Sequence, residues 1–226
     1  MDELKSDGTA DPRIIGDRLT QVSQELPPHT KLVVVTKYVP ASTIRLVYDL
    51  GVRDFGESRV QVAQQKRQEL ADLPDINWHL IGSLQTNKAK SAIATFEWIH
   101  SLDRLPLAQE LDRLLLSSTM SPQILLQIKP APDPDKSGWT VEQLYQDLPQ
   151  LLQCHNLKIV GLMTILPLGL DHAQSLELFS QVADLRQQLQ SDLPELKHLS
   201  MGMSADYRAA IAAGATMVRI GTRLFS

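Results

Sequence analysis

Residues 32–40 read Leu32-Val33-Val34-Val35-Thr36-Lys37-Tyr38-Val39-Pro40. Four consecutive apolar residues, three of them β-branched, predict a buried β-strand, and Pro40 stops the pattern. If this strand belongs to a parallel sheet, its carboxyl end is where ligands bind, and Lys37 stands at that end. A lysine partly withdrawn from water there becomes nucleophilic and can form a Schiff base with an aldehyde. The alternative is that Lys37 only ends the strand and extends its amine into water.

Strand-like runs and helical patterns alternate along the rest of the chain. The strand-like runs lie at 32–36, 53–56, 77–81, 97–100, 123–128, 157–163, 196–200 and 216–220. The helical patterns lie at 40–50, 58–71, 86–94, 104–117, 140–153, 171–190 and 204–213. This alternation predicts an α/β fold of right-handed βαβ units. Eight strands are the number that closes a (β/α)8 TIM barrel, and an open doubly wound sheet is the alternative, because periodicity does not separate the two.

The N-terminal part divides into a polar tail and a predicted extra helix. Residues 1–10 are expected to form a flexible tail, and 11–226 a single domain. Asp11-Pro12 offers an N-cap and a proline at the first helical position. Apolar residues at helical spacing follow at Ile15, Leu19, Val22 and Leu26.

Composition excludes several classes of function. The chain has 226 residues, 43% of them hydrophobic, and a net charge of −4 with acids and bases interleaved, which argues against binding nucleic acid or a membrane surface. The single cysteine, Cys154, excludes an intramolecular disulfide, fits a reducing cytosol and is expected to pack. We found no signal peptide, no run long enough to span a bilayer and no metal-ligand spacing among the six histidines. These observations predict a cytoplasmic protein without a bound metal.

Two glycine-containing turns follow the last two predicted strands. The first, Ser200-Met201-Gly202-Met203-Ser204, opens the helical pattern 204–213, with Ser204 expected as its N-cap. The second is Arg219-Ile220-Gly221-Thr222. Each alone is typical of an ordinary capped helix or glycine turn, but two such turns at these positions match the usual phosphate site of a TIM barrel. Together with Lys37 they predict an amine that faces an aldehyde whose phosphate is held elsewhere.

Seven motifs in a fixed order resemble one family. They are Val-Val-Val-Thr-Lys (33–37), Phe-Gly-Glu-Ser (55–58), Trp-His-Leu-Ile-Gly-Ser-Leu-Gln-Thr-Asn-Lys (78–88), Lys-Ser-Gly (136–138), Gly-Leu-Met-Thr (161–164), Leu-Ser-Met-Gly-Met-Ser-Ala-Asp (199–206) and Arg-Ile-Gly-Thr (219–222). From about residue 12 to its end, the sequence resembles the pyridoxal 5′-phosphate (PLP) homeostasis protein family, and its cyanobacterial members in particular.

The resemblance implies a single barrel of the alanine racemase N-terminal type that holds PLP as a Schiff base on Lys37. It assigns the phosphate to the two turns, through Ser200, Met201, Gly202, Ser204, Gly221 and Thr222. Arg219 would face the pyridine nitrogen; a strand-end arginine paired with a carboxylate is the alternative. An arginine there discourages protonation of the ring and makes the cofactor a poorer electron sink, so carbanion chemistry is not favoured.

Other residues receive a place near the cofactor from the same resemblance. Ser58, His79 and Met163 are implied as contacts, although His79 equally fits a core histidine and Met163 a residue that fills the barrel. Glu57 either orients groups around the ring or is a surface carboxylate at a helix start. None of these residues is assigned a catalytic role.

The sequence departs from the family pattern at three places. Ser58-Arg59 stands where the family often has Asn-Tyr, and Val39 where many members carry a second lysine. The sequence ends at Leu224-Phe225-Ser226, where many relatives continue with a basic tail. Lys136 is a candidate for transient PLP contact, with a solvated loop lysine as the alternative.

Three functions are compatible with these residues. The first is a monomeric PLP-binding protein without evident catalytic activity, which serves vitamin B6 and amino-acid homeostasis and contacts PLP-dependent apo-enzymes transiently. The second is a PLP-dependent amino-acid racemase. Racemases that resemble this barrel use a tyrosine from a second domain, whereas the four tyrosines here (38, 48, 145 and 207) lie within the barrel repeat, so no opposing acid–base group is evident. The third is a Schiff-base lysine aldolase acting on a phosphorylated substrate.

Overall fold

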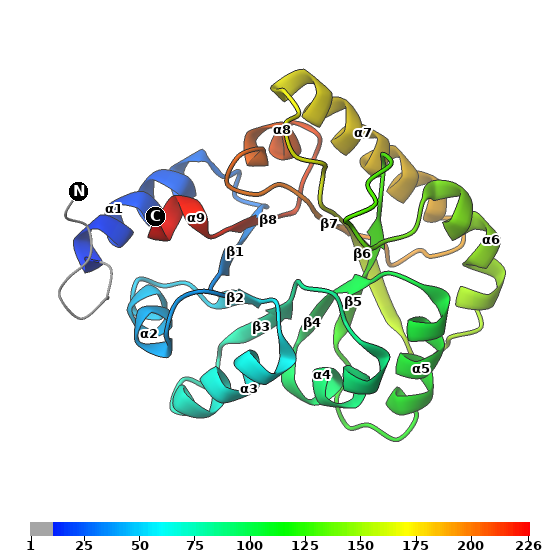
Figure 1. Ribbon diagram of the computed structural model, residues 1–226, viewed down its shortest axis with the longest axis horizontal. Helices are drawn as coiled ribbons and strands as arrows, with labels where there is room; N and C mark the ends of the chain where they lie inside the picture. The colour runs from blue at the N-terminus through cyan, green and yellow to red at the C-terminus, as the bar shows by residue number, and fades with distance from the viewer. Residues whose placement is uncertain (1–10) are drawn as a thin grey trace.

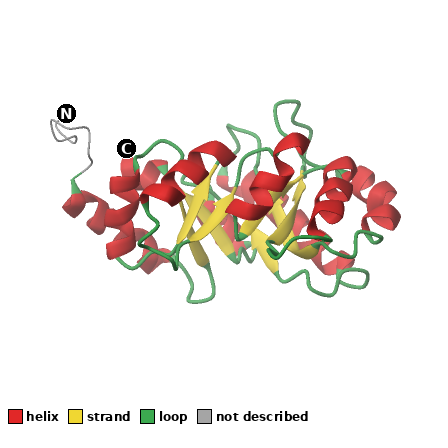
Figure 2. Ribbon diagram, turned by 90° about the horizontal axis from the view of Figure 1, so that it is seen from below, coloured by secondary structure: helices red, strands yellow, loops and turns green. Residues whose placement is uncertain are grey.

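Eight parallel strands pair in chain order and close on themselves as a barrel, in a computed structural model that describes residues 11–226. The strands are β1 (Lys31–Val35), β2 (Asp54–Glu57), β3 (Asn77–Leu80), β4 (Trp98–Leu102), β5 (Gln123–Ile128), β6 (Lys158–Thr164), β7 (His198–Ser200) and β8 (Met217–Ile220). Figure 1 shows them as a ring at the centre of the molecule, and Figure 2 shows the helices on either side of them. The expected tail, 1–10, lies outside the described residues.

The ring closes between the first and the last strand. Lys31 of β1 lies opposite Met217 of β8, and Val34 lies opposite Ile220. An open doubly wound sheet leaves its outer strands unpaired on one side, so this pairing confirms the barrel and rules out the alternative.

Helices follow the strands around the outside of the barrel. They are α1 (Pro12–Glu25), α2 (Ala41–Asp49), α3 (Val60–Glu69), the 3-10 turn η1 (Thr86–Lys88), α4 (Ala89–Thr95), α5 (Leu105–Leu115), α6 (Val141–Leu151), α7 (His172–Leu189), α8 (Tyr207–Ala212) and α9 (Thr222–Phe225). The short helix α9 was not predicted. In the described part of the chain, none of the helices has the length and apolar character needed to cross a bilayer.

The predicted extra helix is α1, and both ends of the described chain meet beside it. The side chain of Asp11 caps the helix by accepting the N–H of Arg13 at 2.8 Å. The residues Ile15, Leu19 and Val22 are buried. Arg18 donates to the carbonyl oxygen of Leu224 at 3.3 Å, which holds α1 against α9 as Figure 1 shows.

Alternate residues of the strands face two different apolar regions. Ile99 and Leu126 belong to the large core between the barrel wall and the helices. Their neighbours Trp98 and Leu125 belong to a smaller cluster inside the barrel. Polar side chains share that interior, among them His79, His100, Ser200 and Arg219, which are all buried.

Candidate functional site

A cavity of about 460 Å³ opens at the carboxyl ends of β1 and β8. Of the residues expected in the site, it brings together Lys37, Ser204, Arg219, Gly221 and Thr222. The other lining residues are Val35, Tyr38, Val39, Pro40, Thr43, Met203, Ala205, Phe225 and Ser226. Segments from both ends of the chain therefore build one cavity.

Lys37 lies in a turn directly after β1. Its side chain is exposed, with Nζ 4.8 Å from the centre of the Tyr38 ring. The expectation that Lys37 is partly withdrawn from water is therefore wrong, and its exposure agrees with the alternative that the amine extends into water. The physical reason is that the chain turns at Lys37 and Tyr38, and Tyr38 is itself 88% exposed, so it covers the amine on one side only. The amine is accessible from the cavity.

The backbone that precedes Lys37 is held by a buried polar cluster. Lys66 Nζ donates to the carbonyl oxygen of Thr36 at 2.8 Å and to Glu57 Oε1 at 2.7 Å. The Thr36 hydroxyl donates to the same carboxylate oxygen at 2.7 Å. The alternative of a surface carboxylate at Glu57 is wrong, because this side chain is fully buried at the end of β2. The cluster fixes the residue from which Lys37 continues.

Arg219 is a buried cation at the wall of the cavity, with 3% of its surface exposed. Its Nη1 donates to the carbonyl oxygen and hydroxyl of Ser200 at 2.7 and 2.6 Å, and its Nη2 to the carbonyl oxygen of Thr164 at 2.8 Å. Within residues 11–226, these bonds use three of the five guanidinium N–H donors, and the other two have no protein partner.

The charge of Arg219 has no carboxylate in contact with it among residues 11–226, so the carboxylate-paired alternative is wrong. Burial lowers the pKa of Arg219 to about 10, and Asp206 opposes this shift through its charge. Arg219 is therefore still a cation at neutral pH. A buried cation with two free donors favours a ligand that carries acceptor atoms or negative charge.

The Gly202 turn needs glycine for two reasons. Its φ is +91°, and a Cβ atom would lie 2.6 Å from Ala210 Cβ and 2.8 Å from Tyr207 Cα. Ser204 does not cap the following helix, which corrects the expectation, because a tight turn intervenes and α8 begins at Tyr207. Instead the Ser204 hydroxyl accepts the N–H of Arg223 at 3.3 Å and joins this turn to α9.

Within the described residues, several backbone N–H groups on the cavity wall are left without partners. No hydrogen bond within residues 11–226 uses the N–H of Ser204, Gly221 or Thr222. A Cβ atom at Gly221 would lie 3.0 Å from the carbonyl oxygen of Val35, so glycine allows this close approach to β1. Free N–H groups that line one wall can hold an anion.

His79 lies deep in the barrel rather than on the cavity. Its Nε2 is 2.9 Å from Asp54 Oδ1, and its Nδ1 is 2.9 Å from His100 Nε2. His100 Nδ1 is in turn 2.9 Å from the Ser200 hydroxyl, which Arg219 also contacts. Sequence reasoning missed His100, although His79 and His100 sit at inward positions of neighbouring strands.

The remaining expected contacts do not line this cavity. Met163 packs in the cluster inside the barrel, and Met201 in the large outer core. Ser58 precedes α3 beside Gly82, and Lys136 is half-buried in the loop after β5. Their roles, with those of Ser200 and Gly202 toward a ligand, stay predictions. Among the described residues, no group of three or more His, Cys, Asp or Glu is arranged to hold a metal ion.

Comparison with known proteins places this geometry in a family. The alanine racemase N-terminal domain family matches residues 11–226. A pyridoxal phosphate homeostasis protein of Synechocystis sp. (strain ATCC 27184 / PCC 6803 / Kazusa) is 51% identical over 208 residues, which cover 91% of this chain and 95% of that protein. The chain belongs to the pyridoxal phosphate homeostasis protein family. A family member from Vibrio alginolyticus is 38% identical and covers 88% of this chain and 87% of its own length.

Solved structures agree with this membership in the pyridoxal phosphate homeostasis protein family. PipY of Synechococcus elongatus PCC7942 without PLP has a TM-score of 0.90 and 48% identity, covering 94% of this chain and 100% of that chain. PipY with PLP bound has a TM-score of 0.89 and 47% identity, with the same coverage. Alanine racemase of Clostridium difficile 630 has a TM-score of 0.73 at 15% identity, covering 94% of this chain and 55% of that one, and shows the shared fold alone.

Proposed function

We propose that this chain binds PLP in the cavity described above and serves PLP and amino-acid homeostasis without catalysing a reaction of its own. One observation carries the proposal. A single cavity joins an accessible amine on Lys37, a buried guanidinium on Arg219, and the backbone N–H groups of Ser204, Gly221 and Thr222. Within residues 11–226, the guanidinium has no carboxylate in contact and these N–H groups have no hydrogen-bond partner. PLP bears the three complementary groups: an aldehyde, a ring nitrogen and a phosphate.

The residues present fit this ligand. Lys37 Nζ would hold the aldehyde carbon as a Schiff base, and the free donors of Arg219 would face the ring nitrogen. The phosphate would meet the N–H groups of Ser204, Gly221 and Thr222. A cavity of about 460 Å³ falls in the range of small-molecule sites.

The same residues support storage rather than conversion of the ligand. When bound, PLP supplies an electron sink for chemistry on amino acids. Arg219 donates a hydrogen bond while keeping its positive charge, which disfavours a proton on the ring nitrogen and weakens that sink. Among the described residues, the titratable side chains that line the cavity, apart from Arg219, are Lys37 and Tyr38. Because these two are adjacent and in contact, they stand on one side of the cavity, and within residues 11–226 no titratable side chain other than that of Arg219 faces them.

The proposal also covers the location of the protein, its oligomeric state and its partners. We infer a monomer in the cytosol that contacts PLP-dependent apo-enzymes transiently. Val39 lines the cavity at the position where the family resemblance implies a second lysine in many members, so any handover of PLP from this chain does not use an amine there. Lys136 stays a candidate for such a contact.

Spectrophotometric titration with PLP tests the function. The wild-type protein should develop the absorbance of a covalent lysine–PLP bond, and Lys37→Ala should lose it while keeping its far-UV circular dichroism. Lys90→Ala, at an exposed position of α4, is the matched control and should retain the band. A covalent band that persists in Lys37→Ala contradicts the assignment. Racemisation of an amino acid above the Lys37→Ala background would favour the racemase alternative, and cleavage of a phosphorylated sugar without PLP would favour the aldolase.

A further inference from the structure

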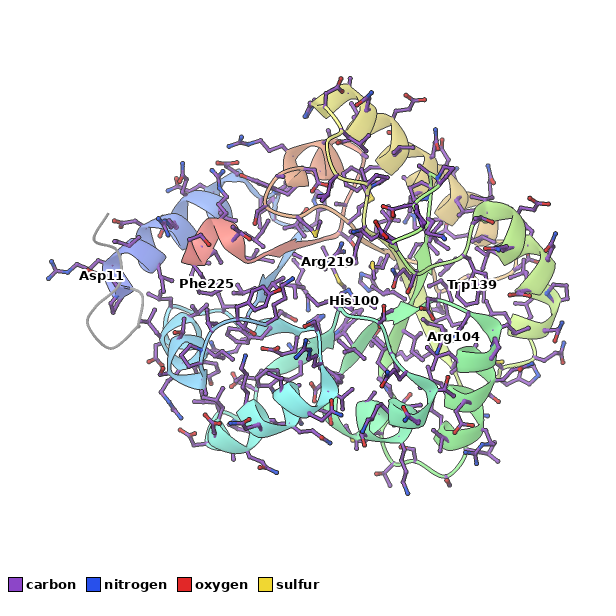
Figure 3. The ribbon with its side chains drawn as sticks, in the orientation of Figure 1. Asp11, His100, Arg104, Trp139, Arg219 and Phe225 are labelled. Atoms are coloured by element: carbon purple, nitrogen blue, oxygen red, sulfur yellow. The ribbon has the colours of Figure 1, made fainter. Side chains whose placement is uncertain are left out.

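A continuous chain of hydrogen bonds crosses the barrel interior from β8 to β2. Arg219 Nη1 lies 2.6 Å from Ser200 Oγ, which lies 2.9 Å from His100 Nδ1. The other ring nitrogen of His100, Nε2, lies 2.9 Å from His79 Nδ1. His79 Nε2 in turn lies 2.9 Å from Asp54 Oδ1. Figure 3 shows His100 and Arg219 near the centre of the ring of strands. One end of the chain lies at the cavity, and the other reaches the amino-terminal end of β2.

The residues at the two ends of this row of hydrogen bonds fix the direction in which every group donates. The guanidinium of Arg219 can only donate. Burial raises the pKa of Asp54, but hydrogen bonds from His79 and Lys31 outweigh it and leave the pKa below its usual value. Asp54 is therefore a carboxylate at neutral pH and can only accept.

The positions of the intervening protons follow from these ends. His79 must donate from Nε2 to Asp54, so its Nδ1 accepts from His100 Nε2 when His79 is neutral. His100 Nδ1 then accepts from the Ser200 hydroxyl, whose lone pair accepts from Arg219. Burial lowers the pKa of His79, and that of His100 further still, so both imidazoles are neutral at neutral pH. The protons in this network of hydrogen bonds have a single arrangement, because the reverse one would require the guanidinium of Arg219 to accept a hydrogen bond.

The fixed direction of these hydrogen bonds determines how the two remaining N–H donors of Arg219 are oriented. Because the Ser200 hydrogen is committed to His100, the Ser200 oxygen always offers Arg219 an acceptor. Together with the carbonyl oxygens of Ser200 and Thr164, this acceptor holds the plane of the guanidinium. Without His100, the Ser200 hydroxyl is free to rotate and the guanidinium loses one of its restraints.

We propose that His100 and His79 are positioning residues, which hold Arg219 through Ser200 so that its two free donors face the ring of the bound ligand. This inference rests on the proposed PLP function. The histidines lie too deep to line the cavity, so they act through Ser200 and Arg219 rather than by touching PLP.

A double-mutant cycle tests the coupling. PLP dissociation constants and visible circular dichroism of bound PLP are measured for wild type, His100→Phe, Ser200→Ala and the double variant. We expect His100→Phe to weaken PLP binding about tenfold and change the dichroism, and the double variant to lose no more than the larger single loss. His100→Gln should restore both readouts, because its amide can accept from Ser200 and donate to His79.

His198→Phe is the matched control. His198 packs edge-on against Trp98 inside the barrel but takes no part in the hydrogen bonds that link Arg219 to Asp54. It should bind PLP as wild type does. Additive losses in the cycle, or wild-type binding and dichroism in His100→Phe, would overturn the proposal.

Nitrogen-15 NMR of the unsubstituted protein covers the case in which His100→Phe does not fold. His100 and His79 should both be neutral with the proton on Nε2, and PLP should shift the His100 signals but not those of His198. A proton on Nδ1 of either residue, or His100 signals that PLP leaves unchanged, would overturn the proposal. If wild type takes up no PLP, the proposed function fails and this inference falls with it, whereas wild-type uptake with an uncoupled His100 defeats the inference alone.

Discussion

Lys66 and Glu57 form an ion pair of 2.7 Å whose side chains are 10% and 1% exposed. The lysine comes from α3 and the carboxylate from the end of β2. Among the described residues, Glu57 Oε2 has no hydrogen-bond partner. A buried carboxylate with one unsatisfied oxygen depends strongly on its cation. Because the same amine binds the carbonyl oxygen of Thr36, this pair supports the segment from which Lys37 projects.

Removing the cation should therefore destabilise the barrel. We expect Lys66→Met to lower the free energy of unfolding by about 3–5 kcal/mol, since Glu57 would be left charged and unpaired in the interior. Urea denaturation of the ligand-free protein measures the loss. Lys90→Met is the control, because Lys90 is exposed on α4, and its change should stay within about 0.5 kcal/mol. Equal losses in the two variants would show that burial of the pair does not matter.

A methyl group at Gly202 should disturb the turn beside the cavity more than backbone strain alone explains. Gly202 and Gly214 have φ values of +91° and +89°, but a Cβ at Gly214 would meet nothing within 4 Å. Gly214→Ala should cost about 1–2 kcal/mol of unfolding free energy from its left-handed backbone. Gly202→Ala should cost clearly more and also weaken PLP binding, because Ala210 and Tyr207 must move. Equal costs, measured by urea denaturation, would contradict the close packing of this turn.

The planar fork of Arg219 should matter beyond its charge. Arg219→Lys keeps a cation but cannot bind Ser200, Thr164 and a ligand together, so we expect at least about tenfold weaker PLP binding and an altered visible spectrum. Arg208→Lys, on the outside of α8, is the control and should leave both unchanged. PLP affinity and spectrum that Arg219→Lys leaves intact would count against Arg219 as a ligand contact.

The buried histidines should make the protein sensitive to acid. Burial lowers the pKa of His79 and His100, so below about 6.5 the unfolded chain binds protons that the native protein does not. The free energy of unfolding should therefore fall as the pH drops below about 6.5, by up to about 1.4 kcal/mol per pH unit for each histidine.

A variant isolates this contribution. His100→Gln should give a shallower fall in the free energy of unfolding between pH 6.5 and 5, measured by urea denaturation at a series of pH values. His172→Gln, at the exposed start of α7, controls for loss of a histidine from the surface. The same slope in wild type and His100→Gln would contradict neutral burial of His100.

The barrel could be predicted because its pattern is local. Strands such as β1 and β5 contain apolar runs bounded by helical patterns. The observed strands, including the short and more polar β2 and β7, begin and end within two residues of the predicted ranges. The prediction that the sheet closes rested on the number of strands and on the family resemblance. No local pattern predicts it, because the pairing of β1 with β8 joins segments far apart in the sequence.

The details of the site depend on contacts that the sequence does not display. The cap expected at Ser204 failed because Asp206 instead accepts the N–H of Met203 and closes a tight turn ahead of α8. The exposure of Lys37 follows from a turn rather than from the strand pattern. His100 was missed because its partners come from β3 and β7, which only the closed barrel brings together.

The most direct measurement of the central claim is a map of where PLP is attached. The protein loaded with PLP is reduced with borohydride, digested and analysed by mass spectrometry. A reduced PLP adduct on the peptide that contains Lys37, absent from Lys37→Ala, is the predicted result. An adduct on Lys66 or Lys136 in its place, or no adduct on any lysine, would contradict the account.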